Sequence, residues 1–311
     1  MPTTNVFDSA QRALAESVTA RVWIISDLQQ SDPQRAERCL MTAIDDFRAL
    51  GLSCQQIWYL GDSVEGHDLA RLHATADMQH AMLAALDVPV RFVLGNHDFD
   101  YTRKHSPTSA PAVPFYERVR QTISWRTISH VEEFYFLDEL AGHQIVFFSD
   151  HADPSGRWVS THGQVHGEAA LYAHDRERYR SLSEQIAASG KPCIIAAHYA
   201  FAGGNRPSAL MDQMLPLPAN VRLHVYGHAH IGDSQWAGKD CFRKIACIDG
   251  QPIPQVDIAS LENYRGSGTR SAFLEFYNDG SLGVLFRNHD LRQWTDIFLT
   301  GRDSHHSFAQ G

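Results

Sequence analysis

Residues 90–98 read VRFVLGNHD, a short apolar run that ends in a glycine, an amide, an imidazole and a carboxylate. Four further apolar runs of the chain also end in groups that are able to bind metal. They are residues 22–25 before Asp27, residues 57–60 before Asp62, residues 193–197 before His198, and residues 223–226 before His228 and His230. Near-continuous apolar runs of this length are typical of strands that are buried on both faces.

Helical periodicity separates the first three of these runs. Residues 34–50 and 68–86 place apolar side chains largely on one face, and Gly51 stands where a helix commonly ends in a left-handed residue. Strand–helix–strand repetition predicts right-handed crossovers and a parallel sheet. Ligands then collect beyond the carboxyl ends of the strands.

Two later parts of the chain have the pattern of antiparallel pairs. Residues 134–140 and 144–149 turn near Ala141 and Gly142, and residues 273–277 and 282–286 flank an Asn-Asp-Gly turn. We expect these pairs to form a second sheet, partly antiparallel, that packs on the first. The predicted fold is therefore a single α/β domain over residues 1–311, a two-sheet α/β/β/α sandwich whose first 20 residues form a helix or an arm.

The composition excludes several classes of protein. The net charge is −9, from 27 Lys and Arg against 36 Asp and Glu, which argues against long nucleic acid as a partner. No apolar run reaches the length of about 18 residues that a membrane span needs, and the N-terminus lacks the pattern of a secretory signal. Five cysteines without a CxxC pair are typical of reduced thiols. We expect a cytoplasmic protein that does not bind membranes, with its oligomeric state left open.

The polar groups at the strand ends form a set of metal-binding types. Two carboxylates, one amide oxygen and three imidazoles are present: Asp27, Asp62, Asn96, His198, His228 and His230. This set is rich enough for two divalent ions if one carboxylate bridges them. Two ions about 3.5–4 Å apart stabilise both the attacking and the leaving oxygen of a phosphoryl displacement. Gly61, Gly95 and Gly227 would let the backbone turn sharply beside these ligands.

These residues carry a resemblance to a known family. The series Asp27-x-Gln29, Gly61-Asp62, Gly95-Asn96-His97-Asp98, a lone His198 and Gly227-His228-x-His230 resembles the calcineurin-like metallophosphoesterase superfamily in order and spacing over residues 22–230. The resemblance implies that Asp62 bridges two metal ions. It implies one site completed by Asp27, Gln29 and His230, and a second completed by Asn96, His198 and His228.

The resemblance also implies a mechanism. A metal-bound hydroxide would attack the phosphorus, and His97 would lie beside the substrate phosphate, where it stabilises charge or protonates the leaving group. Asp98 would orient the ring of His97. Both residues would act without binding metal.

Two departures from the family pattern refine the expectation. The family usually has histidine at the position of Gln29, and an amide oxygen shifts the preference from zinc toward manganese or magnesium. We therefore expect two divalent ions, manganese first, with iron, magnesium and zinc as alternatives. The Asp-x-Gln start also resembles the manganese-dependent ADP-ribose/CDP-alcohol diphosphatase branch. In residues 61–66, Glu65 is not followed by the arginine of protein Ser/Thr phosphatases, which argues against phosphoprotein substrates.

The expected function is metal-dependent hydrolysis of a phosphoester or phosphoanhydride bond in a small phosphodiester or a nucleotide-type diphosphate. A phosphomonoesterase or a nuclease of the same superfamily is the first alternative, and a scaffold of this fold without turnover is the second. Substrate-binding candidates are Tyr101 and Arg103 in the loop 99–114, and Arg206 soon after His198. The loop is equally compatible with a solvated surface. Residues 260–270 have the composition of a flexible segment that either covers the site or has no role.

Overall fold

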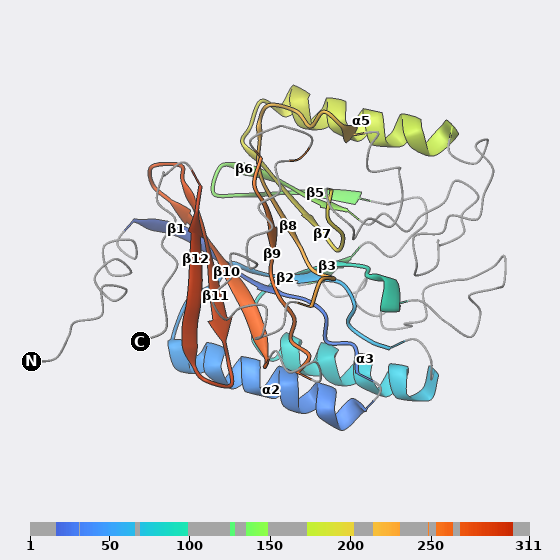
Figure 1. Ribbon diagram of the computed structural model, residues 1–311, viewed down its shortest axis with the longest axis vertical. Helices are drawn as coiled ribbons and strands as arrows, with labels where there is room; N and C mark the ends of the chain where they lie inside the picture. Colours follow the sequence, from blue (N-terminus) through green and yellow to red (C-terminus); the bar gives the residue numbers. More distant parts are fainter. Residues whose placement is uncertain are drawn as a thin grey trace, which may run out of the picture.

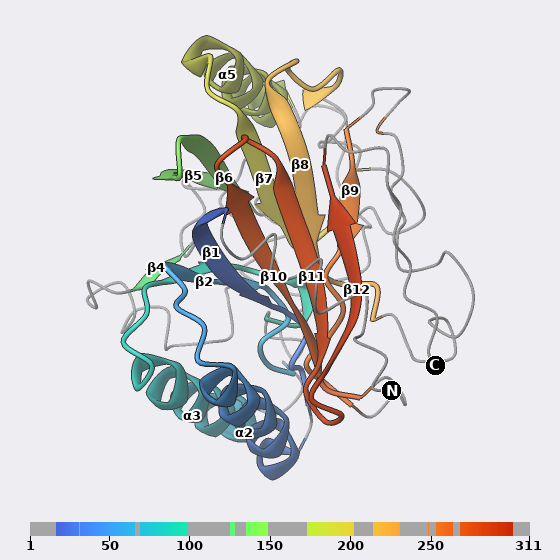
Figure 2. The ribbon, with the colours of Figure 1, turned by 90° about the vertical axis from the view of Figure 1, so that its left-hand side faces the viewer.

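Two β-sheets and three long helices make up the part of the chain that the computed structural model describes (Figure 1). That part comprises residues 17–30, 32–65, 69–98, 125–127, 135–148, 173–201, 214–230, 248, 253–263 and 268–300. The predicted α/β/β/α sandwich is confirmed. Helices α2 (Pro33–Leu50) and α3 (Leu69–Ala84) cover the outer face of one sheet, and α5 (Ala173–Ser189) lies on the opposite side of the molecule, against the other sheet (Figures 1 and 2).

The first sheet has seven strands in the order β12-β11-β10-β1-β2-β3-β4. Their bounds are β1 (Val18–Ile25), β2 (Gln56–Leu60), β3 (Val90–Val93), β4 (Trp125–Thr127), β10 (Arg270–Tyr277), β11 (Leu282–Asn288) and β12 (Gln293–Leu299). Strands β1 to β4 are parallel, as the strand–helix–strand pattern predicts. Strands β10 to β12 are antiparallel and join the sheet where β10 pairs with β1.

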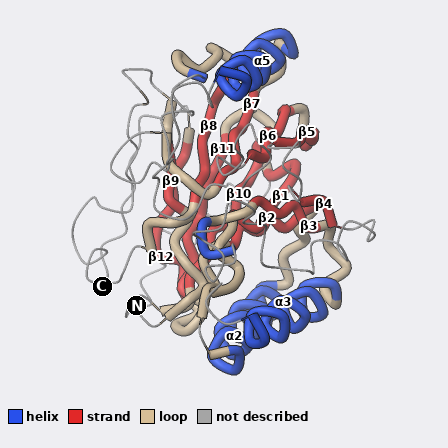
Figure 3. Tube along the Cα trace, turned by 90° about the vertical axis from the view of Figure 1, so that its right-hand side faces the viewer, coloured by secondary structure: helices blue, strands red, loops and turns tan. Residues whose placement is uncertain are grey.

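The second sheet has five strands in the order β5-β6-β7-β8-β9. Their bounds are β5 (Tyr135–Leu140), β6 (His143–Phe148), β7 (Cys193–Ala197), β8 (Val221–Tyr226) and β9 (Gln255–Asp257). Strands β6 to β9 are parallel, and β5 is the antiparallel edge strand. Figure 3 shows the strands of both sheets between the two helical layers.

The C-terminal hairpin lies in a different sheet from the one expected. Strands β10 and β11 form the predicted hairpin, but they extend the first sheet and not the second. The expectation was wrong because a hairpin pattern fixes only the pairing between its own two strands. The free edge of β1 accepts β10 over six residue pairs, from Val18 opposite Tyr277 to Ile24 opposite Ala272.

The predicted helix boundary at Gly51 is confirmed. Helix α2 begins after Asp32, whose side chain accepts a hydrogen bond from the Gln34 N–H, and Pro33 occupies the first turn. Gly51 ends the helix with φ 62° and donates its N–H to the Arg48 carbonyl. The buried face of this helix packs on the first sheet, where Phe47 stacks on Trp23 of β1.

Aromatic and charged side chains hold the two sheets together. Trp58 of β2 packs edge-to-face on Phe147 of β6, with 5.1 Å between ring centroids. Arg91 of β3 forms an ion pair with Asp138 of β5, and Gln56 donates a hydrogen bond to the same carboxylate. The sheets therefore pack face to face, with both sets of parallel strand ends on one side of the interface.

Two expectations concern the ends of the sequence. Residues 1–16 of the expected N-terminal helix or arm lie outside the described residues, whereas Val18–Ala20 are the beginning of β1 and not part of a helix. None of the helices that the structure describes combines the length and the apolar character that a transmembrane helix requires.

Candidate metal centre

Five side chains at the carboxyl ends of parallel strands meet where the two sheets adjoin. Asp27 and Asp62 follow β1 and β2 of the first sheet. His198 follows β7 of the second sheet, and His228 and His230 follow β8. Each sheet thus supplies one chemical type, carboxylates from the first and imidazoles from the second.

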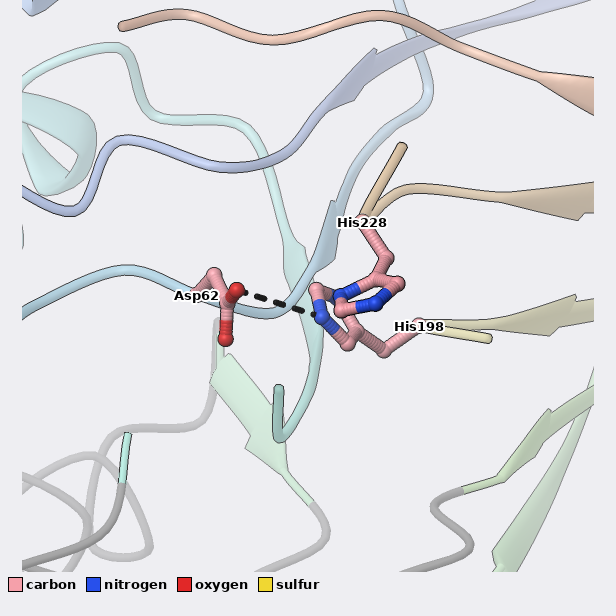
Figure 4. A group of neighbouring side chains, drawn as sticks. All are labelled: Asp62, His198 and His228. Atoms are coloured by element: carbon pink, nitrogen blue, oxygen red, sulfur yellow. Dashed lines mark ion pairs between the residues drawn. The ribbon is translucent and has the colours of Figure 1, made fainter. Parts of the chain in front are cut away.

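These side chains form two groups that share one carboxylate. Asp62, His198 and His228 make the first group, and Asp27, Asp62 and His230 make the second. Within each group, one potential ligand atom from each residue lies within 4.8 Å of the others. Figure 4 shows the first group, with the rings of His198 and His228 on one side and the Asp62 carboxylate facing them. Asp62 therefore lies where a bridging ligand would have to lie.

The contacts within the groups join nitrogen to oxygen. His198 Nε2 lies 3.3 Å from Asp62 Oδ2, and His230 Nε2 lies 3.0 Å from Asp27 Oδ1. On the far side of its ring, His198 Nδ1 lies 2.7 Å from the Leu60 carbonyl, which suits an Nδ1–H donor and turns Nε2 toward the carboxylate. Asp27 and Asp62 are fully buried, as is the greater part of each of these histidines.

Four of these residues have a left-handed backbone conformation. The φ angles are 56° at Asp27, 51° at Asp62, 71° at His228 and 46° at His230. This conformation is uncommon for residues other than glycine, although Asp and His adopt it more readily than most, and such strain concentrates at functional sites. Hydrogen bonds hold it in place: Asp27 donates its N–H to the Gly61 carbonyl, and Asp27 Oδ2 accepts from the His228 N–H at 2.8 Å.

The three glycines beside the ligands have two different roles. Gly61 has φ 86°, which agrees with the expected sharp turn. Gly95 and Gly227 are required for close packing instead. A Cβ atom on Gly95 would lie 2.2 Å from Asp62 Oδ1, and one on Gly227 would lie 2.6 Å from Asp27 Oδ2. The absent side chains let the loops of both sheets approach the carboxylates.

The electrostatics favour ionised carboxylates. Burial acts to raise the pKa of Asp62, but His198 and His97 outweigh it and hold this pKa well below its usual range. Asp27 behaves in the same way, since His230 lowers its pKa against the effect of burial. Burial also disfavours charge on His198, yet Asp62 raises its pKa to about 9, whereas burial lowers the pKa of His228 to about 4. Without a cation, His198 thus holds a proton that metal binding would displace.

The donor set fits divalent cations. Among the described residues, Asp27 Oδ1, Gln29 Oε1 and His228 Nδ1 are buried and have no hydrogen-bond partner. Buried polar atoms without partners are costly, and a bound cation would satisfy acceptor atoms of these types. Carboxylate and imidazole groups are ordinary ligands of zinc, manganese and iron.

Gln29 lies at the second group, as expected from the sequence. Its amide nitrogen is 2.7 Å from His230 Nε2 and 3.4 Å from Asp62 Oδ2. A rotation of 180° about the terminal bond would exchange the two amide atoms and place the oxygen among the ligand atoms of this group. The ligand role of Gln29 therefore stays a prediction that is compatible with its position.

Several expected site residues are not placed by the structure. The backbone of Asn96 forms the first residue of a 3₁₀ turn, η1 (Asn96–Asp98), directly after β3, but its side chain lies outside the description. Tyr101, Arg103 and Arg206 lie outside the described residues altogether. Their proposed roles in metal and substrate binding stay predictions.

Asp98 has other partners than the expected ring of His97. It is fully buried, and its carboxylate accepts hydrogen bonds from the N–H groups of Asp62, Ser63, Val64 and Gly95. These bonds tie the loop after β3 to the loop after β2. Asp98 therefore positions the backbone of Asp62, which the expectation of a ring-orienting role did not foresee.

A glutamate contacts His97 in place of Asp98. His97 Nδ1 lies 3.0 Å from Glu65 Oε2, and the His97 N–H donates to Asp62 Oδ1 at 2.6 Å. Burial acts to lower the pKa of His97, but Asp62 and Glu65 raise it above its ordinary value. The side chain is 23% exposed, so that the ring can reach a molecule at the centre.

A second glutamate was also missed by reasoning from the sequence. Glu262 is buried, and its Oε1 lies 2.9 Å from His230 Nδ1. Glu65 had a signal in its place three residues after Asp62. Glu262 had none, because it lies in the segment 260–270 with the composition of a flexible loop.

Comparison with a family model gives one match. The model described as calcineurin-like phosphoesterase matches residues 20–232, about two thirds of the chain. The matched range begins in β1 and ends just after His230, so it contains all the residues of both groups. The comparison with curated proteins gave no match.

Three solved structures illustrate the likeness of the fold. The purple acid phosphatase from yellow lupin (Lupinus luteus) seeds is 13% identical over 90% of this chain, with a TM-score of 0.49. The sulfate thiohydrolase SoxB from Thermus thermophilus is 10% identical over 90% of this chain, with a TM-score of 0.44. The NAD nucleotidase from Haemophilus influenzae is 12% identical over 85%, with a TM-score of 0.41. This chain spans about half of the length of each, namely 53%, 56% and 54%.

Proposed function

Because this chain belongs to the calcineurin-like phosphoesterase family, we propose that it is a metal-dependent hydrolase of a small phosphodiester or of a nucleotide-type diphosphate. The observation that supports this proposal most is the pair of ligand groups that share Asp62. Five buried or largely buried side chains from two sheets converge there, four of them on strained backbone. A scaffold without turnover would have no need to maintain such an arrangement.

We assign the ligands as the two groups suggest. Asp62 would bridge two divalent ions, with Asp27, Gln29 and His230 at one and His198 and His228 at the other, where Asn96 would complete the set. Bound cations supply positive charge for the phosphoryl oxygens and lower the pKa of coordinated water. The oxygen-rich set that contains Gln29 favours manganese over zinc.

His97 would act on the leaving group. Glu65 contacts Nδ1 of the ring and, with Asp62, favours the protonated form, so the ring holds a proton at neutral pH. A proton given to the leaving oxygen would avoid the departure of an unstable alkoxide. The Asp98 carboxylate contributes indirectly, because it fixes the loop that carries Asp62.

The proposal is tested by a hydrolysis panel with metal-stripped protein to which manganese, magnesium, iron or zinc is returned. The panel covers aryl mono- and diesters, cyclic nucleotides, ADP-ribose and CDP-alcohols. We expect turnover of a diester or a diphosphate only with metal, and its loss with chelator and in Asp62→Asn. Monoesters as the best substrates would overturn the substrate class, and full turnover by metal-free protein would overturn the mechanism.

A further inference from the structure

The segment that follows β9 in the second sheet crosses to the end of β1 in the first. Leu261 donates its N–H to the Ser26 carbonyl, and Glu262 donates its N–H to the Asp27 carbonyl, both at 3.0 Å. These main-chain bonds hold Glu262 directly beside a proposed metal ligand. Its side chain is fully buried, which is rare for a glutamate without a partner for its charge.

The Glu262 side chain reaches the imidazole of His230. Glu262 Oε1 lies 2.9 Å from His230 Nδ1, while His230 Nε2 on the other side of the ring lies 3.0 Å from Asp27 Oδ1. The ring is thus oriented with Nδ1 toward the glutamate and Nε2 toward the second ligand group. An imidazole that binds metal through Nε2 must carry its proton on Nδ1, and a carboxylate at hydrogen-bond distance from Nδ1 favours this tautomer.

We propose that Glu262 is a positioning residue, which holds His230 as the Nδ1–H tautomer with Nε2 directed at the metal ion of the Asp27 group. This inference rests on the proposed metal site. Glu262 does not bind metal or substrate itself. Its carboxylate also raises the electron density of the ring through the hydrogen bond, so that Nε2 becomes a better donor.

The geometry separates this role from a purely structural one. The bond between the chain segments uses the main-chain N–H of Glu262, which a side-chain substitution leaves in place. Glu275 offers a matched control, because it is a second buried carboxylate of the first sheet that pairs with Arg21 and Tyr277. Arg21 lies near the beginning of β1, far along the strand from Asp27 at its end.

The test uses the full chain and metal alone, without substrate. Binding of Mn²⁺ and Zn²⁺ is measured by calorimetry in the wild type, Glu262→Gln, Glu262→Ala and Glu275→Gln. We expect Glu262→Ala to bind metal about 10–100-fold more weakly at one of two sites, with the other unchanged. Glu262→Gln retains an acceptor for Nδ1–H and should lie between Glu262→Ala and the wild type. Glu275→Gln should bind as the wild type does.

Nitrogen NMR of the zinc-loaded protein gives a second readout. The His230 signal is assigned with His230→Gln, and its Nδ1–H should be protected from exchange in the wild type and exchange rapidly in Glu262→Ala. Wild-type affinity at both sites in Glu262→Ala, or an unchanged His230 signal, would overturn the positioning role. If the wild type itself bound no metal, the proposed function would fail instead, so that the two failures are distinguishable.

Discussion

Gln29 is the residue at which the candidate centre departs most from an all-imidazole and carboxylate set. Its amide lies at hydrogen-bond distance from His230 Nε2. If the amide oxygen binds metal, Gln29→His should tighten zinc binding and shift the preference for turnover from manganese toward zinc, because imidazole is the stronger donor to a borderline metal. Gln29→Ala should leave about one metal bound and little activity. Metal analysis of dialysed protein, together with turnover in each metal, measures both effects.

The result that would contradict this role is equally specific. If Gln29 points away from the metal and water completes its shell, both variants would keep the metal stoichiometry and the metal preference of the wild type.

His97 carries a second prediction at this scale. His97→Ala should slow substrates with poor leaving groups by roughly 10²–10⁴, because the proton donor is lost. Activated aryl leaving groups need little protonation and should be affected less. Glu65→Gln should show the same pattern to a smaller extent, since Glu65 contacts the ring at 3.0 Å and does not meet the leaving group. The measurement is kcat for alkyl and aryl esters, with metal content as the control.

Equal losses for both kinds of substrate would speak against proton donation and for charge stabilisation. Lost metal in His97→Ala would instead show that the backbone bond from His97 to Asp62 depends on this side chain.

The positions of the main ligands could be predicted because each follows its own strand. Asp27, Asp62 and His228 stand at strand ends, and parallel strands bring such positions together. Glu65 and Glu262 could not be assigned in this way. Their roles depend on contacts with His97 and His230, which are 32 residues away in each case, and such pairs produce no periodicity or spacing motif.

At the scale of elements, helix α2 is joined to the first sheet by a buried ionic network. Arg287 of β11 donates two hydrogen bonds of 2.8 Å to Asp46 of α2, and His289 Nδ1 lies 2.9 Å from the same carboxylate. The Ser271 hydroxyl lies 2.7 Å from His289 Nε2 and accepts a hydrogen bond from Trp23. The network is far from the strand ends that carry the ligands, so its effect on stability can be measured separately.

This network should make stability depend on pH in a defined direction. Burial acts to raise the pKa of Asp46, but Arg287 and His289 hold it well below its ordinary value. A carboxylate with a lowered folded-state pKa contributes stability above its unfolded pKa of about 3.9, and loses it as the pH falls below that value. Asp46→Asn should lower the free energy of unfolding by about 3–5 kcal/mol at pH 7, because Arg287 is left buried without its partner.

Urea unfolding of the wild type and Asp46→Asn, both with chelator present, measures this contribution. The difference between the two proteins should narrow as the pH is lowered from 4 to 2. A difference that stays constant over this range would show that Asp46 stabilises the fold by packing and not by its charge.

The strands and helices were largely predictable, but their arrangement was not. Apolar runs identified β1, β2, β3, β7 and β8, and helical periodicity identified α2 and α3, because burial on both faces or on one face leaves a local pattern. The sheet that receives β10 and β11 depends on the free edge of β1, which no pattern within residues 270–288 specifies. Partner choice between strands is a property of the assembled sheet.

At the scale of the whole molecule, the centre is built across the contact between the two sheets. The first sheet supplies Asp27 and Asp62, and the second supplies the three histidines. The Arg91–Asp138 ion pair and the Trp58–Phe147 ring contact hold the same two sheets together elsewhere in the molecule. A cation bound between the groups would add a cross-link of the same kind, which the sequence could suggest only through the resemblance of the ordered motifs.

Metal should therefore stabilise the folded chain as a whole. A ligand that binds only the folded state raises the free energy of unfolding by about 2.7 kcal/mol when its concentration is 100 times its Kd. Urea unfolding with and without Mn²⁺ should show an increase of this size for each occupied site. Asp62→Asn should lose most of the increase, because its amide cannot bridge two cations. Asp138→Asn removes a carboxylate between the sheets that lies outside both ligand groups, so it should lower stability with and without metal alike and keep the increase. An equal gain from Mn²⁺ in Asp62→Asn and the wild type would show that the cation binds elsewhere than between the sheets.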